Sequence, residues 1–205
     1  MIFKQETQIL KCTFEKEHFS KVKAAFKDRW PVVYIIEDDE KGQAYIGEST
    51  NICTRICDHW NNTERRALKN IYIIFNKVFN KSVILDLEAF LIGYIVADGK
   101  YRLQNGNGGQ HVHNYYLRDE YQREFRHIWQ LLQDEGVVRH GITLLENQDL
   151  FKYSPYKILN LDQFNVAVQI LTDLKYDLGN NNQSRSFIID GGAGTGKSIL
   201  GIYLL

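Results

Sequence analysis

Apolar residues recur at two different spacings in the first hundred residues, and these spacings outline a small mixed domain. Runs rich in β-branched and aromatic residues are typical of strands, and they occupy residues 32–38, 44–49 and 71–75. The polar stretch between the first two runs contains Gly42, so we expect a hairpin there. Apolar residues at helical spacing predict helices within 14–30, 50–60 and 82–99.

The segment 82–99 is apolar almost all round, which predicts the central buried helix of this domain. Ser82 is the expected N-cap, and Asp98 with Gly99 forms the expected stop signal. The fold class that follows is α/β of the α+β type, in which a three-stranded antiparallel sheet is flanked by helices.

The second half of the chain has a different organisation. A loop rich in Gly and Asn at 103–110 precedes a charged amphipathic helix at 115–136. Further on, a turn followed by a helix is expected within 158–178, and a strand at 185–190. We therefore expect four parts: an N-terminal helical extension at 1–30, a compact domain at 31–115, a helix with a linker at 116–155, and the beginning of another domain at 156–205.

Composition narrows the class of protein. Hydrophobic residues make up 44% and charged residues 24% of the chain, as in ordinary globular proteins. The formal net charge is zero, so attraction to nucleic acid must rest on local groups. Cys12, Cys53 and Cys57 lack zinc-type pairing, and no apolar run is long enough to span a membrane. These features, with the lack of a signal peptide pattern, predict a cytoplasmic protein with no membrane partner.

A glycine-rich loop near the end of the chain has the pattern G-x-x-x-x-G-K-[ST]. Its members are Gly191, Gly194, Gly196, Lys197 and Ser198. Glycines allow backbone N–H groups to turn toward a phosphate, the lysine supplies a positive charge, and the serine can bind Mg²⁺. With the strand expected before the loop and the helix expected after it, this pattern predicts an ATP-binding P-loop.

Upstream of the loop, the stretch LNLDQFNVAV resembles the adenine-reading Q motif of superfamily 1 helicases, with Gln163 in the matching place. The alternative is that Gln163 is a surface helix residue. The resemblance implies a nucleotide-binding domain whose acidic Mg²⁺ partner and arginine finger lie on later elements. We therefore expect a truncated ATPase that does not turn over ATP.

A second set of reactive side chains lies in the first domain, and its members are Tyr34, Tyr45, Arg55, His59, Glu88 and Asn105. Phenols on neighbouring strands can share one face of a sheet, and residues four apart share one face of a helix. A guanidinium offers a forked donor for phosphate oxygens. A carboxylate on an otherwise apolar helix must neutralise, pair with a cation such as Arg55, or bind a metal.

The spacing of these residues resembles the GIY-YIG nuclease superfamily over about residues 31–110, with Tyr45-Ile46-Gly47 as its second motif. The first motif departs from the pattern, because Val32 and Val33 stand where Gly and Ile are usual. The resemblance implies hydrolysis of DNA phosphodiester bonds, with Mg²⁺ or Mn²⁺ held by Glu88. Tyr34 is the implied general base.

Other roles implied by the resemblance remain open at this point. Either Tyr45 or His59 assists the deprotonation of Tyr34, and Asn105 or Asn107 orients the site. Gly47 allows a close approach at the end of its strand.

Two alternatives to a nuclease follow from the same residues. The domain could bind nucleic acid or nucleotide without cutting, or its face could be covered by the apolar segment 198–205. His111 and His113 have the spacing of a zinc pair but no third ligand nearby, so we interpret them as loop or substrate contacts.

Overall fold

The computed structural model describes residues 7–26, 29–106, 109, 114–147, 166–167, 169–171, 173–174, 186–192 and 197–203. The chain divides into two compact units, Met1–Leu145 and Glu146–Leu205. The domain limits expected from the sequence stay predictions.

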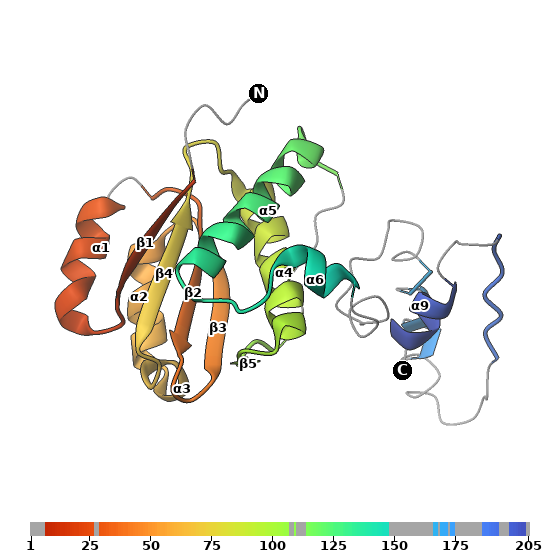
Figure 1. Cartoon of the computed structure of the whole chain (residues 1–205), viewed down its shortest axis with the longest axis horizontal. Helices are drawn as coiled ribbons and strands as arrows, with labels where there is room; N and C mark the ends of the chain where they lie inside the picture. Colours follow the sequence, from red (N-terminus) through yellow and green to blue (C-terminus); the bar gives the residue numbers. More distant parts are fainter. Residues whose placement is uncertain are drawn as a thin grey trace. The chain divides into compact units, whose positions relative to one another are not determined.

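A mixed sheet of five strands lies at the centre of the first unit, in the order β1-β4-β2-β3-β5 (Figure 1). The strands are β1 (Gln8–Thr13), β2 (Val32–Asp38), β3 (Gln43–Ser49), β4 (Asn70–Phe75) and β5 (Arg102–Leu103). The pairs are antiparallel except β3 with β5, which is parallel. The α/β fold class is confirmed, and the three expected strands form the middle of the sheet.

Both additional strands lie at the edges of the sheet, which is why the sequence pattern did not predict them. The segment 1–30 was expected to be only helical, yet its residues Gln8–Thr13 pair with β4 as an edge strand that is partly exposed. The second edge strand, β5, has two residues and comes directly before the glycine-rich loop. Edge strands this short or this exposed carry a weak hydrophobic alternation.

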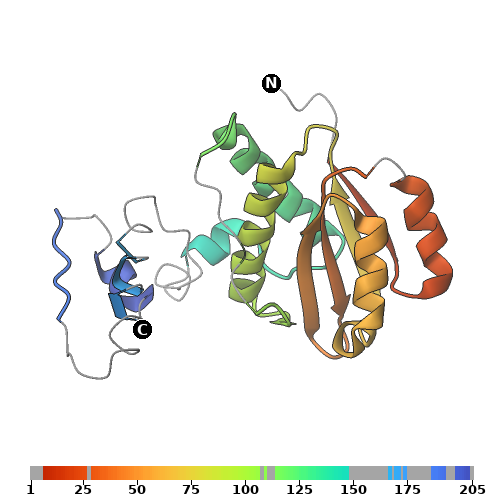
Figure 2. The same ribbon diagram turned by 180° about the vertical axis from the view of Figure 1, so that it is seen from behind.

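Helices cover both faces of the sheet, as two opposite views show (Figures 1 and 2). The helix α1 (Phe19–Ala25), which follows the short 3₁₀ turn Lys16–His18, and α2 (Ile52–Asn61) pack on one face. On the other face lie α4 (Lys81–Asp98) and α5 (Arg118–Asp134). The remaining helices of this region are α3 (Thr63–Arg66) and α6 (Ile142–Asn147). None of the helices in the described part of the chain has the length and apolar character that a membrane crossing requires.

The helix α4 is the buried central helix that its apolar sequence predicts, but it begins earlier than expected. Asn80, not Ser82, is the N-cap, because its extended backbone lets its side chain accept the N–H of Val83 at 3.1 Å. Gly99 ends the helix in the left-handed conformation with φ 69°, as predicted. Buried Asp86 binds α5 to α4 by accepting hydrogen bonds from Tyr115 and Gln122.

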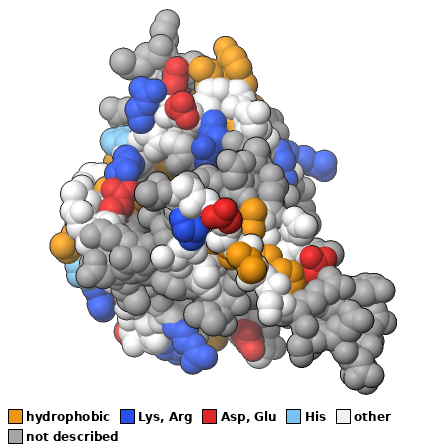
Figure 3. Space-filling view, turned by 90° about the vertical axis from the view of Figure 1, so that its right-hand side faces the viewer, with side chains coloured by type: hydrophobic (Ala, Val, Ile, Leu, Met, Phe, Trp, Pro, Cys, Tyr) orange, Lys and Arg blue, Asp and Glu red, His pale blue; other side chains and the backbone are white. Residues whose placement is uncertain are grey.

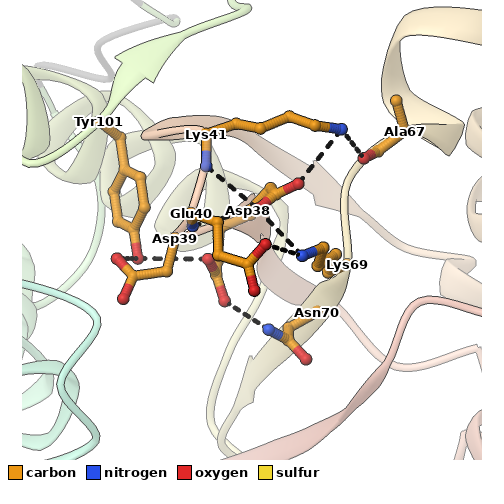
Figure 4. Close-up of polar contacts among 9 residues, drawn as sticks. Asp38, Asp39, Glu40, Lys41, Ala67, Lys69, Asn70 and Tyr101 are labelled. Carbon is orange, nitrogen blue, oxygen red and sulfur yellow. Dashed lines mark hydrogen bonds and ion pairs between the residues drawn. The ribbon is translucent and has the colours of Figure 1, made fainter.

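The turn between β2 and β3 is held by a compact polar network (Figure 4). Asp38, whose side chain is fully buried, lies 3.3 Å from the ammonium group of Lys41 and 3.9 Å from that of Lys69. Buried Glu37 accepts a hydrogen bond from Asn70 at 2.9 Å and another from Tyr101 at 3.3 Å. Asp38 is thus paired with lysines and Glu37 is hydrogen-bonded within the protein, so the network stabilises the hairpin.

In the second unit, the described residues at 166–167, 169–171 and 173–174 are helical, and α9 (Lys197–Tyr203) follows the glycine loop. The strand expected at 185–190 is wrong for its described part, because 186–190 have no regular secondary structure and Ile188 is 93% exposed. A strand needs a neighbour for its backbone groups, and the described residues of this unit include no other strand. The predicted residues Gln163, Gly194 and Gly196 lie outside the described residues, as do Asn107, His111 and His113.

Candidate active site

Strand pairing places the two predicted phenols on one face of the sheet. In the β2–β3 register, Tyr34 lies opposite Gly47 and Ile36 lies opposite Tyr45. Opposed residues point to the same face, and so do residues two apart along a strand. The rings of Tyr34 and Tyr45 therefore share the face that α2 covers, with centroids 6.3 Å apart.

Gly47 makes room for the Tyr34 ring. A Cβ atom at this position would lie 2.3 Å from the Tyr34 hydroxyl oxygen and 2.5 Å from its Cζ. The ring thus crosses directly over the glycine of the opposite strand, and no other residue could occupy that position without moving it.

Two residues of α2 bring polar groups to the Tyr34 hydroxyl. Asn51 caps the helix by accepting the N–H of Thr54, which sets where α2 begins. Four residues apart on one face, Arg55 and His59 both point at Tyr34. The His59 Nε2 lies 2.7 Å from the hydroxyl oxygen, and the Arg55 Nε donates to it at 3.3 Å.

This cluster is removed from water. Tyr34 is 0% exposed and His59 is 1% exposed. Burial raises the pKa of the Tyr34 hydroxyl, the nearby Tyr45 adds to this, and the Arg55 hydrogen bond opposes it. Burial also lowers the pKa of His59 to about 3, assisted by the positive charges of Arg65 and Arg55. The imidazole is therefore neutral at pH 7.

The outer edge of β3 brings Asn105 and Glu88 to the site. Where β5 ends, the Asn105 side chain continues its pairing by accepting the Ile46 N–H at 3.0 Å and donating to the Ile46 carbonyl at 2.8 Å. Two residues after Ile46 along β3, the backbone N–H of Glu48 donates to the Glu88 carboxylate. An amide side chain and a carboxylate thus take the places of a neighbouring strand, and α4 delivers the carboxylate to this edge.

Electrostatics at this edge favour a cation. Burial, together with the charge of Glu48, raises the pKa of half-buried Glu88 to about 7, while Lys81 and Arg55 act in the opposite direction. Lys81 pairs with Glu48 at 2.5 Å. A positive ion at Glu88 would offset the cost of its charged form.

A single-carboxylate site suits magnesium. No group of three or more His, Cys, Asp or Glu side chains able to hold a metal occurs among the described residues. Mg²⁺ keeps several waters and commonly uses one or two carboxylates together with substrate phosphates. Glu88 offers one such carboxylate at the edge of β3.

The described residues of the glycine loop form hydrogen bonds with residues close to them in the sequence. The Lys197 ammonium donates to the carbonyls of Gly191 and Gly192 at 2.6 and 2.8 Å. The Gly191 N–H donates to the Asp190 carboxylate at 2.7 Å. Ser198 is exposed at the beginning of α9.

Residues 31–102 match the family model of the GIY-YIG catalytic domain. This segment is similar to a GIY-YIG catalytic domain. No curated protein and no solved structure matches the chain. Members of this family hydrolyse phosphodiester bonds as nucleases, so the matched segment is a nuclease-type domain.

The matched segment begins directly before β2 and ends in β5, close to the limits that the sequence resemblance predicted. It includes five of the six predicted catalytic residues, and Asn105 lies just beyond it. The structure brings all six around β2 and β3, and their individual roles stay predictions. No pattern in the sequence pointed to Arg65, which contacts both His59 and Tyr45.

Proposed function

We propose that this protein is a divalent-metal-dependent endonuclease that hydrolyses DNA phosphodiester bonds at the GIY-YIG site. The observation that carries the proposal is the Tyr34 hydroxyl, whose oxygen lies within hydrogen-bond reach of both Arg55 and His59. Close by, at the edge of β3, Glu88 has the electrostatics of a cation ligand.

Each residue has a distinct task in this mechanism. Arg55 is half-buried and reaches the Tyr34 hydroxyl, so it is placed to bind the phosphodiester oxygens beside it and to stabilise the charge that builds on them. Tyr34 takes the proton of the attacking water as a phenolate, after its own hydroxyl proton has left to solvent. Burial opposes this ionised form, and the Arg55 hydrogen bond favours it. A Mg²⁺ or Mn²⁺ ion held by Glu88 supplies Lewis-acid polarisation and stabilises the leaving oxygen. Asn105 holds β3, and with it Tyr45 and Gly47.

The burial of Tyr34 sets a condition on this mechanism. Because the phenol is 0% exposed, water reaches its oxygen only when a covering side chain moves. Arg55 covers the oxygen and is only half-buried, so we expect it to turn toward the substrate phosphate as DNA binds. That movement would uncover the hydroxyl and place the guanidinium on the reacting group.

DNA recruitment does not rest on a global positive field. The chain has a formal net charge of zero. On the face shown in Figure 3, basic and acidic side chains are interspersed with hydrophobic ones. Binding of the phosphodiester therefore depends on the local cations of the site.

Plasmid nicking tests the proposal. The purified chain should convert supercoiled DNA to open circles with Mg²⁺ or Mn²⁺ and not with EDTA. We expect Glu88→Ala and Tyr34→Phe to reduce the rate by about a thousandfold, since they remove the metal ligand and the base. Glu64→Ala, on an exposed residue at the start of α3, is the matched control and should cut normally. Nicking that survives Glu88→Ala would refute this mechanism.

A binding module without cleavage is the second candidate, and the complete burial of Tyr34 favours it. In that case the chain would bind DNA in a filter-binding or fluorescence-polarisation assay with Mn²⁺ present. Prolonged incubation would produce no nicks.

A separate proposal concerns the glycine loop, which we infer to bind ATP in the cytoplasm as the opening of a helicase-like domain. It is supported by the motif and by α9, which begins at Lys197 directly after the loop. Binding of a fluorescent ATP analogue with Mg²⁺ tests this proposal, and no saturable signal would reject it.

A further inference from the structure

Arg65 is a charged residue that contacts two rings of the site from a separate helix. It lies in α3, and its side chain is half-buried, whereas the adjacent Arg66 is exposed. Its Nη1 lies 3.0 Å from the His59 Nδ1. Its Cζ lies 3.9 Å from the centroid of the Tyr45 ring. One guanidinium therefore holds the edge of the imidazole and covers the face of the second phenol.

This contact determines which nitrogen of His59 carries the proton. A guanidinium has only donors, so the His59 Nδ1 must be the acceptor of the Arg65 hydrogen bond. The neutral imidazole has one proton, which is then on Nε2. The Nε2–H faces the Tyr34 oxygen at 2.7 Å and donates to it.

The direction of that hydrogen bond matters for proton transfer. The Tyr34 oxygen accepts from His59 and, before DNA binds, from Arg55. Once Arg55 turns to the phosphate, His59 is the donor that remains to stabilise the ionised form. In the opposite tautomer, Nε2 would accept the phenolic proton, and Tyr34 would be held as a donor to His59. A neutral phenol held in that way keeps its own proton unless it passes that proton on to Nε2.

The contact of Arg65 with Tyr45 also restrains the aromatic rings around Tyr34. The Tyr45 and His59 rings have centroids 4.8 Å apart, and the Arg65 guanidinium lies over the Tyr45 ring. Arg65 thus restrains both neighbours of Tyr34 without touching Tyr34 itself.

We propose that Arg65 is a positioning residue that holds His59 in its Nε2–H tautomer, so that His59 donates to the Tyr34 oxygen and stabilises the phenolate that accepts a proton. This inference rests on the proposed nuclease function for its consequence, while the tautomer can be measured independently. The competing explanation is that Arg65 only braces α3 against the sheet.

Nitrogen NMR of the histidine side chains in the full chain tests the tautomer directly. Two-bond ¹H–¹⁵N spectra distinguish protonated from unprotonated ring nitrogens, and His59→Gln identifies the His59 signals among the six histidines. We expect the wild type to show a protonated Nε2 and an unprotonated, hydrogen-bonded Nδ1. Arg65→Met should shift population toward the Nδ1–H form, Arg65→Lys should preserve the wild-type pattern, and Arg66→Met should have no effect. An Arg65→Met spectrum identical to wild type would overturn the proposal.

Cleavage kinetics then test the consequence. We expect Arg65→Met to lower kcat by about a hundredfold with little change in KM, because the base is misdirected while the phosphate contacts remain. Arg65→Lys should recover most of the activity, since an ammonium group also only donates. A lower melting temperature with unchanged tautomer and kcat would show mere bracing and overturn the inference. If the wild type does not cut DNA, the proposed function fails, and the NMR result still decides whether Arg65 sets the tautomer.

Discussion

The site on β2 and β3 and the glycine loop near the end of the chain are both proposed to bind phosphate, but they are assembled differently. In the first, Tyr34 and Asn105 are far apart in the sequence, and each is joined to β3: Tyr34 lies opposite Gly47, and the Asn105 side chain bonds to Ile46. In the second, the contacts of Lys197 are with Gly191 and Gly192, a few residues away. A local motif is easy to recognise in a sequence, whereas a site made of distant residues depends on the whole fold.

Burial separates the two regions as well. Tyr34 is 0% exposed, and α2 and β3 enclose it. Ile188, in the segment expected to be the strand before the glycine loop, is 93% exposed. Packing therefore encloses Tyr34, Tyr45 and His59 of the candidate site, whereas the strand expected before the glycine loop is not formed in the described residues. This contrast predicts that substitutions will differ strongly in effect between the regions.

The largest effect should come from filling the space under Tyr34. Gly47→Ala places a methyl group 2.3 Å from the Tyr34 hydroxyl oxygen, so the ring must move away from Arg55 and His59. We expect nicking to fall by about a hundredfold or more, with a lower melting temperature. Gly106→Ala is the control, because nothing lies within 4 Å of the added carbon. Normal cutting by Gly47→Ala would show that Tyr34 tolerates displacement and would weaken its assignment as the base.

A smaller loss should follow from releasing the edge of β3. Asn105→Ala removes both hydrogen bonds to Ile46 and leaves that backbone without its partner. We expect about tenfold slower nicking and a loss of about 1–2 kcal/mol in the free energy of unfolding. Hydrogen exchange at the Ile46 amide should accelerate. Asn105→Asp retains the acceptor alone and should give an intermediate exchange rate, and unchanged exchange in both variants would contradict the assigned role.

A pH-dependent effect on stability should follow from the raised pKa of Glu88. Its pKa is about 7 in the folded chain against an ordinary value of 4.5, so the folded state holds more protons between these values. Wild-type stability should therefore fall as pH rises through this window. Glu88→Gln cannot ionise, and we expect it to melt about 5 °C higher than wild type at pH 8 and equally at pH 4.5. Glu64→Gln should show no such dependence, and a pH-independent gain in Glu88→Gln would refute the electrostatic cause.

The smallest effect on cleavage should come from the glycine loop. Lys197→Ala removes contacts that are confined to its own loop. We expect the nicking rate to be unchanged, while any binding of a fluorescent ATP analogue is lost. A parallel loss of nicking would show instead that the two regions act together.

Most of the strands and helices of the first unit can be predicted from the local pattern of apolar and polar residues. The three middle strands, the buried helix α4 and its stop at Gly99 were predictable because continuous apolar runs and a left-handed glycine leave strong local signals. The cap at Asn80 was missed in favour of Ser82, since both residue types cap helices and only backbone geometry distinguishes them. The strand β1 was missed because its pairing with β4 is a long-range event.

The sequence alone determined which residue types were available for the chemistry: two phenols, a guanidinium, an imidazole and a carboxylate at spacings that register and helix periodicity can unite. Only the tertiary structure decided their environment. Burial lowers the pKa of His59, Arg65 directs its proton toward Tyr34, and the β3 edge receives Glu88 and Asn105. The physical reason is that burial and hydrogen-bond direction depend on neighbours brought together by packing, and a linear spacing does not contain them.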